Sequence, residues 1–248
     1  MQLIVNDLAI SYQLSGNGKT LLFLHGWGDN QATFKALIAG LGKNFQVLTL
    51  DLPGFGASQA PPKAWNLDAY ARCLDGFLAK LEVKPYAIIG HSNGGALAIR
   101  ALAINELNAE KLVLIASAGI RNSQPLKRRA TKLVAKAGKA TTFWLPVRTR
   151  QGLRKKLYGT VGSDMLVVPE LSETFKLTVA QDVQADASKL TLPTLIINAD
   201  SDPAIPIKDG QLLHQLIKGS RFVILHSKSH FIHQEQAESV AKEILKFL

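Results

Sequence analysis

Residues 86–95 read Tyr-Ala-Ile-Ile-Gly-His-Ser-Asn-Gly-Gly, a short apolar run that ends in a Gly-x-Ser-x-Gly pattern. A stretch of small residues with a helical pattern follows. This order is typical of a sharp turn from a strand to a helix, in which Gly90 and Gly94 leave space that larger side chains would occupy. Such a turn holds the hydroxyl of Ser92 away from the backbone, so the pattern predicts a serine placed for nucleophilic attack on a carbonyl carbon.

Apolar runs and helical patterns alternate on both sides of this turn. We expect a hairpin across Asn6-Asp7, joining residues 3–5 and 9–13, and then strands over residues 21–24, 46–50, 87–89, 111–116, 194–198 and 221–225. Helical patterns cover residues 31–41, 67–82, 94–105, 208–218 and 234–248. This alternation predicts an α/β fold whose inner strands are parallel and covered by helices on both faces.

Residues 121–190 interrupt the alternation after the sixth expected strand. They show helical patterns and no clear strand, so we interpret them as a helical insertion above the carboxyl edge of the sheet. The core is then residues 1–120 and 191–248. The insertion holds 14 Lys/Arg and 5 Asp/Glu, whereas the rest of the chain holds 15 and 14. Nearly all of the net charge of +10 therefore lies in this segment.

Composition excludes several classes of protein. The chain of 248 residues has one cysteine, so it has neither an internal disulfide framework nor a metal site made of several cysteines. Its first residues lack the basic and apolar regions of a signal peptide. No apolar run approaches the length that crosses a membrane. We expect a cytoplasmic protein.

A nucleophilic serine needs a general base, and the chain offers six histidines. His230 lies between the last expected strand and the last expected helix, in a loop at the carboxyl edge of the sheet, from which an imidazole could reach Ser92. We therefore predict His230 as the base. His226, at the end of a strand, is the alternative. His233 is interpreted as a helix-start or surface residue and His214 as a solvated one.

The carboxylate that orients the base should come from a neighbouring loop at the same edge. Asp200 and Asp202 both follow the strand over residues 194–198. We favour Asp202, which lies farther into the loop and precedes a proline that restricts the backbone. Asp200 is expected to accept hydrogen bonds from turn amides. No acidic residue occurs between Ala116 and Asp164, which excludes an acid directly after the strand over residues 111–116.

Two backbone amides should stabilise the oxyanion. The amide of Asn93 directly follows the nucleophile at a helix start, where the helix dipole favours negative charge. The other amide should follow the strand that ends at His25-Gly26, which indicates Trp27. The Trp27 side chain would then line the substrate pocket or pack against the core.

Five ordered segments resemble the α/β-hydrolase superfamily. They are His-Gly-Trp-Gly-Asp at 25–29, Asp-Leu-Pro-Gly-Phe-Gly-Ala-Ser at 51–58, Gly-His-Ser-Asn-Gly-Gly at 90–95, the Asp-Pro…Pro loop at 202–206, and Ser-His-Phe at 229–231. The order Ser, Asp, His along the chain is the one expected of that fold. The resemblance covers the chain except residues 121–190.

The resemblance implies roles for individual residues. Ser92 would be the nucleophile, Asp202 the acid and His230 the base, and the amides of Trp27 and Asn93 would form the oxyanion hole. Two positions depart from the family pattern, because Ser229 and Ala199 stand where glycine is usual; both residues are small. His25 and His91 resemble structural residues, with His91 packed beside the turn, and Asp29 and Asp51 resemble carboxylates that hold loops.

By its place in the chain, the insertion over residues 121–190 resembles the cap that covers the active site of α/β hydrolases and selects their substrates. Cationic residues recur at three- and four-residue steps from Arg128 to Lys139, which indicates a helix with a basic face. We interpret this face as a solvated exterior, and as an alternative we consider that it attracts an anionic substrate or an anionic surface. Nucleic acid is not expected, because no recognised binding motif accompanies the charge.

Together these features predict a serine hydrolase that cleaves a carboxylic ester through an acyl-enzyme, with no metal and no organic cofactor. Hydrolysis of a lactone, thioester, amide or carbon–carbon bond by the same residues stays open. A ligand receptor that retains the triad without appreciable turnover is an alternative of another class. The sequence does not indicate an oligomeric state.

Overall fold

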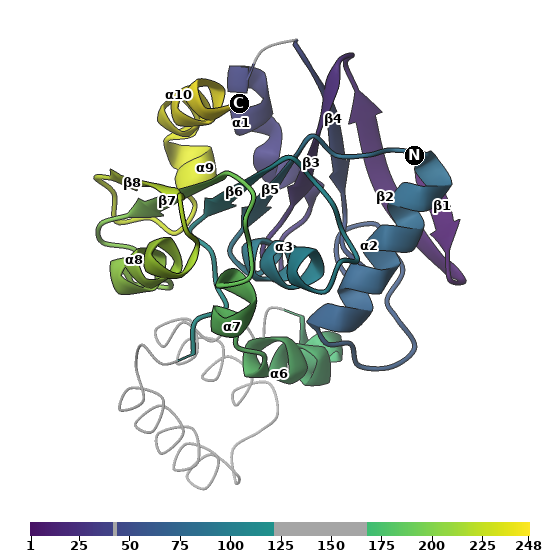
Figure 1. Cartoon of the computed structure of the whole chain (residues 1–248). Helices are drawn as coiled ribbons and strands as arrows, with labels where there is room; N and C mark the ends of the chain where they lie inside the picture. The colour runs from purple at the N-terminus through teal and green to yellow at the C-terminus, as the bar shows by residue number, and fades with distance from the viewer. Residues whose placement is uncertain (42–43, 122–167) are drawn as a thin grey trace, which may run out of the picture.

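The computed structural model describes residues 1–41, 44–121 and 168–248. In this part of the chain, eight strands form one sheet in the order β1-β2-β4-β3-β5-β6-β7-β8 (Figure 1). The strands are β1 (Gln2–Val5), β2 (Leu8–Ser15), β3 (Lys19–Leu24), β4 (Phe45–Leu50), β5 (Ala87–His91), β6 (Lys111–Ile115), β7 (Thr194–Ala199) and β8 (Arg221–Leu225). The predicted hairpin and the six following strands are confirmed.

Strand direction divides the sheet into two parts. The hairpin of β1 and β2 is antiparallel, and β2 runs antiparallel to β4. From β4 to β8 all neighbours are parallel. Leu24 pairs with Gly90, and His91 pairs with Ile115, so β3, β5 and β6 end together at one edge. The loops after β3, β5, β7 and β8 therefore meet at the carboxyl edge, where ligands bind in open α/β sheets.

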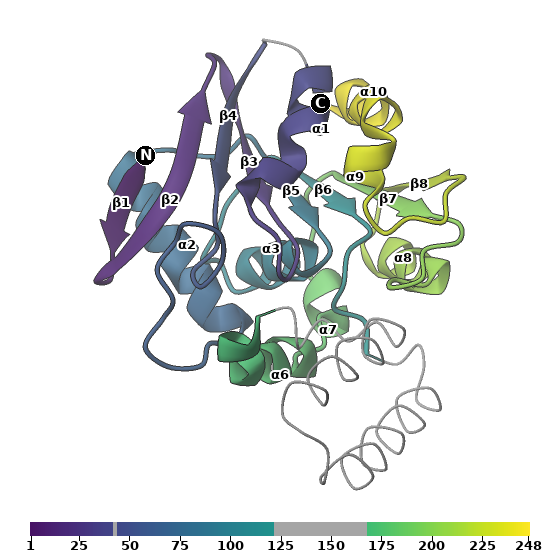
Figure 2. The same ribbon diagram turned by 180° about the vertical axis from the view of Figure 1, so that it is seen from behind.

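Helices cover both faces of the sheet (Figures 1 and 2). One buried apolar cluster lies beneath α2 (Leu67–Leu81), α3 (Asn93–Ala103) and α8 (Ile207–Leu216). A second lies between the other face and α1 (Lys35–Leu41) with α10 (Ala237–Phe247). Because strands β3, β5 and β6 are buried on both sides, their sequences are nearly continuous apolar runs.

The helix α2 shows how sequence determines these elements. The side chain of Asn66 accepts a hydrogen bond of 3.0 Å from the amide of Ala69, which caps the first turn. The helix ends where Glu82 adopts a left-handed conformation with φ of 54°. Its apolar residues recur at helical spacing and are buried against the sheet, among them Tyr70 and Phe77. Burial of this stripe, rather than helix propensity, supplies most of its stability.

Two helices differ from the sequence prediction. Residues 31–41 begin as a 3₁₀ turn, η1 (Gln31–Phe34), before α1, because Asn30 accepts a hydrogen bond from the amide of Ala32 and tightens the first turn. The closing helix is divided into α9 (Ile232–Glu235) and α10, since the backbone leaves helical geometry at Gln236. The interpretation of His233 as a surface residue is wrong, because α9 turns its side chain into the core with 0% exposure.

Within the predicted insertion, the structure describes residue 121 and residues 168–190. There the chain forms η3 (Pro169–Leu171), α6 (Ser172–Ala180) and α7 (Gln184–Ala187). Arg100 on α3 joins this segment to the core by donating to Asp68 at 2.8 Å and to Asp186 at 3.0 Å. The cationic residues from 128 to 139 lie outside the described residues, and the boundaries of the insertion stay a prediction. Among the described helices, none is long and apolar enough to span a bilayer.

Candidate active site

Ser92 occupies a strained turn between β5 and α3. Its backbone has φ of 51° and ψ of −117°, a conformation that residues with side chains rarely adopt. A Cβ atom added to Gly94 would lie 2.1 Å from the carbonyl oxygen of Leu24, and one added to Gly90 would lie 2.6 Å from the Cα of Gly95. The glycines of the Gly-x-Ser-x-Gly pattern are therefore required by the close approach of backbone segments around the serine.

His230 and Asp202 face each other from neighbouring loops. The loop after β7 carries Asp202 and the loop after β8 carries His230, whose Nδ1 lies 2.8 Å from Asp202 Oδ2. The other carboxylate oxygen accepts hydrogen bonds from the amides of Ala204 and Ile205 at 2.7 and 2.9 Å. Because the ionised carboxylate only accepts, His230 Nδ1 carries the hydrogen, and Nε2 presents a lone pair. This tautomer is the one that a general base requires.

Asp200 makes a separate pair near the protein surface. Its Oδ2 lies 2.5 Å from Nδ1 of His226, whose side chain is 95% exposed, and its Oδ1 accepts a hydrogen bond from the amide of Ser227 at 3.1 Å. The two candidate acids thus have different partners. The side chains of Asp202 and His230 are almost buried, with exposures of 0% and 14%. Asp200 and His226 form their pair at the solvent-exposed surface, next to the loop after β8.

The loop after β3 lies directly against the serine turn. A Cβ added to Gly26 would be 3.2 Å from the Cβ of Ser92, so a larger residue here would crowd the serine. The next residue is Trp27, one of the two predicted amide donors. The other, Asn93, is the first residue of α3, and the first amides of a helix have no acceptor within the helix. Both amides therefore belong to segments that adjoin Ser92.

His25 and Asp51 hold the loops beside the site. His25 donates from Nδ1 to the carbonyl of Gly26 at 2.8 Å, and its Nε2 accepts a hydrogen bond of 2.9 Å from the amide of Leu52. Burial lowers the pKa of His25, which keeps it neutral as this donor and acceptor pattern requires. Asp51 accepts from the amides of Gln31 and Ala57 at 2.8 and 2.9 Å.

An aromatic group borders the same edge. The Trp27 ring packs against Phe55 and against Phe175 of α6, with centroids 4.9 and 5.0 Å apart in edge-to-face geometry. Both the packing and the pocket-lining interpretation of Trp27 are compatible with this position, since its side chain is only partly buried. Phe175 is a contact that the sequence analysis missed, because helical periodicity alone does not show which residue of α6 faces the core.

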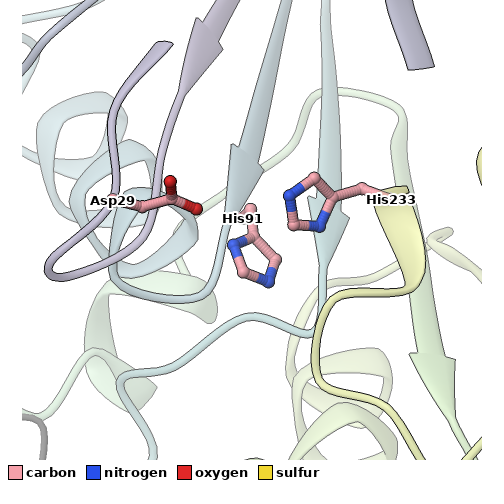
Figure 3. Close-up of side chains that lie close together, drawn as sticks. All are labelled: Asp29, His91 and His233. Atoms are coloured by element: carbon pink, nitrogen blue, oxygen red, sulfur yellow. The ribbon is translucent and has the colours of Figure 1, made fainter. Parts of the chain in front are cut away.

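The structure also brings together Asp29 from the loop after β3, His91 at the end of β5 and His233 from α9 (Figure 3). One potential ligand atom from each lies within 4.8 Å of the other two. Two histidines and a carboxylate are a donor set that zinc accepts, but a tetrahedral zinc ion with bonds of about 2.1 Å holds its ligands about 3.4 Å apart. The limit of 4.8 Å is wider than that spacing, so the arrangement does not by itself require a metal, and we assign none to the group.

Burial controls the protonation of the two histidines in this group. Burial lowers the pKa of His91 well below its ordinary value of 6.5, and the neighbouring His233 and His230 lower it further. The pKa of His233 falls to about 4, again mainly through burial, with Asp29 acting in the opposite direction. Both side chains are therefore neutral near pH 7. No local sequence pattern indicates this group, because its members lie in different segments.

Comparisons with known proteins agree with this architecture. A family model described as "Alpha/beta hydrolase family" matches residues 21–243. A pimeloyl-[acyl-carrier protein] methyl ester esterase of Neisseria meningitidis is 28% identical over 90% of this chain and 74% of its own length. Among solved structures, an enol-lactonase from Burkholderia xenovorans superposes with a TM-score of 0.76 at 22% identity, covering 100% of this chain and 99% of the lactonase. A bacterial membrane phospholipase A gives 0.80 at 21% identity, covering 100% and 84%.

Proposed function

Because the chain belongs to the alpha/beta hydrolase family, we propose that it is a serine hydrolase that cleaves carboxylic esters through an acyl-enzyme intermediate. The observation that supports this most is the hydrogen bond of 2.8 Å between His230 Nδ1 and the buried Asp202, at the edge where the turn carries Ser92. That pair leaves Nε2 of His230 as a base, and the neighbouring serine is the natural group for it to deprotonate.

The reaction would proceed in two steps. Ser92 Oγ attacks the acyl carbon while His230 Nε2 takes its proton, and the amides of Trp27 and Asn93 stabilise the negative oxygen of the tetrahedral intermediate. The alcohol leaves with the proton that His230 returns, and the acyl group stays on Ser92. Water then attacks the acyl-enzyme with His230 again as base, which releases the acid and restores the serine. Asp202 holds the imidazole in the required tautomer and stabilises the imidazolium that forms.

We choose an ester as the bond that is cleaved because the relative from Neisseria meningitidis is named a methyl ester esterase. Lactones, thioesters, amides and carbon–carbon bonds are alternatives for the same residues, and a lactonase shares the fold. The partly buried Trp27 and its contact with Phe175 place apolar surface at this edge, so we expect the acyl or alcohol part of the substrate to be apolar.

The central experiment uses short p-nitrophenyl esters. Wild-type protein should hydrolyse them, the Ser92→Ala variant should not, and a fluorophosphonate probe should label Ser92. The matched control is Ser220→Ala, which changes a serine bonded to His214 on the protein surface and should leave hydrolysis unchanged. Labelling of another residue, or full activity in Ser92→Ala, would overturn the nucleophile. A protein that binds esters without turning them over would instead be the receptor considered above.

The basic face between residues 128 and 139 stays interpreted as a solvated exterior, with attraction of an anionic substrate or an anionic surface as the alternative. If it attracts an anionic surface, the protein should co-sediment with anionic liposomes at low salt more than with neutral ones, and salt should abolish the difference. Equal sedimentation with both lipids would contradict the surface interpretation and leave the solvated exterior.

A further inference from the structure

The side chain of His91 contacts the loop that carries the proposed base. His91 ends β5 directly before Ser92, and its Nε2 lies 3.1 Å from the carbonyl oxygen of His230. The two imidazole rings lie with centroids 4.8 Å apart. His91 is 1% exposed, so water does not compete for this contact. The residue next to the nucleophile is therefore bonded to the backbone of the base.

This contact determines the tautomer of His91. A carbonyl oxygen only accepts hydrogen bonds, so Nε2 of His91 must carry the hydrogen and donate it. Its Nδ1 then has no hydrogen, and among the described residues it has no hydrogen-bond partner. The depressed pKa described above agrees with a neutral ring. A backbone carbonyl in a loop would otherwise be free to rotate, and this hydrogen bond restricts that rotation.

His91 is itself held by packing on its other sides. The ring of His233 lies with its centroid 4.0 Å away, and Nε2 of His233 is 2.8 Å from Thr33 Oγ1. On the side of the loop after β3, a Cβ added to Gly26 would lie 3.1 Å from Nδ1 of His91. Figure 3 shows the His91 ring between Asp29 and His233. The ring thus sits where the loops of the oxyanion amide, the nucleophile and the base meet.

We propose that His91 is a positioning residue that sets the location of His230 relative to Ser92 through its Nε2–H hydrogen bond. The proposal rests on the proposed serine-hydrolase function. Asp202 restrains the His230 ring through Nδ1, whereas His91 restrains the backbone from which that ring extends. A ring held only through Nδ1 could still pivot about that bond, and a displacement of about 1 Å can reduce a rate about 100-fold.

Two substitutions separate the hydrogen bond from packing. His91→Leu fills the buried position with an apolar side chain that has no hydrogen-bond donor. His91→Gln supplies an amide N–H that can reach the same carbonyl. We expect kcat on p-nitrophenyl esters to fall roughly tenfold to 100-fold in His91→Leu with KM little changed, and to recover in large part in His91→Gln. Thr194→Val, which removes a buried hydroxyl that donates to Leu192, controls for a loss of stability away from the site.

The outcomes are decisive in both directions. Wild-type kcat in His91→Leu, or equal losses in both His91 variants, would overturn the proposal. If neither variant folds, nitrogen-15 NMR of the wild-type imidazoles decides, since hydrogen on Nδ1 of His91 instead of Nε2 would overturn it and hydrogen on Nε2 would support it. Failure of the proposed function is recognised separately, because Ser92→Ala would then hydrolyse esters like the wild type while the NMR result still reports on the contact.

Discussion

The buried His233 makes the stability of this protein depend on pH in a calculable way. Its pKa is about 4 in the folded protein, compared with an ordinary value of 6.5. Because the folded state disfavours the proton, the unfolded chain binds more protons as the pH falls from 6.5 toward 4. Stability is therefore present above pH 6.5 and is lost progressively below it. Titration of His233 lowers the free energy of unfolding, relative to its value near neutral pH, by about 2 kcal/mol at pH 5 and by about 0.8 kcal/mol at pH 6.

The perturbation that tests this value is His233→Gln, which keeps a polar side chain but cannot titrate. We expect the free energy of unfolding, measured by urea denaturation at pH 7.5, 6.0 and 5.0, to fall less steeply with acidification in the variant than in the wild type. Between pH 7.5 and pH 5.0 the wild type should lose about 2 kcal/mol more of its free energy of unfolding than the variant does. The variant should still lose some stability on acidification, because the pKa values of the other two buried histidines, His25 and His91, are also lowered.

Thr33→Val is the matched control. It removes the hydroxyl that bonds to His233 Nε2 but leaves the titrating ring in place. This variant should lose stability by a similar amount at every pH, typically about 1 kcal/mol for a hydrogen bond. Parallel curves for His233→Gln and wild type between pH 7.5 and 5.0 would refute the reasoning, because they would show that His233 binds protons equally in both states.

Three further predictions follow from the same geometry. Asp202→Asn should lower kcat by about 10⁴-fold, because the wrong His230 tautomer is then stabilised, whereas Asp200→Asn should stay near the wild-type rate; ester kinetics that reverse this order would exchange the two acids. Gly94→Ala should lose about 3 kcal/mol of stability in chemical denaturation, since a backbone oxygen occupies the place of its Cβ, and wild-type stability would contradict this. Arg100→Met should lower stability by about 2 kcal/mol by leaving Asp186, with a side chain 7% exposed, without its closest ion pair; a midpoint equal to the wild type would show that this pair contributes little.

Most of the fold could be predicted from local patterns, because apolar periodicity and turn residues act over a few neighbouring positions. The strands around residues 87–89 and 111–116 are buried on both faces, so their apolar runs are unambiguous. Helix ends were less predictable. The break at Gln236 depends on how α9 docks His233 into the core, which is a property of packing and not of local sequence.

Sequence alone determined the turn that carries Ser92, because a strand, a tight glycine turn and a helix are adjacent along the chain and their chemistry is local. It also narrowed the acid to Asp200 or Asp202. Only the tertiary structure decided which histidine each aspartate faces, because the two acids are two residues apart in one loop and their partners come from the next loop. The contact of His91 with the His230 carbonyl likewise exists only after β5 and β8 have paired with their neighbours, since 139 residues separate the two positions.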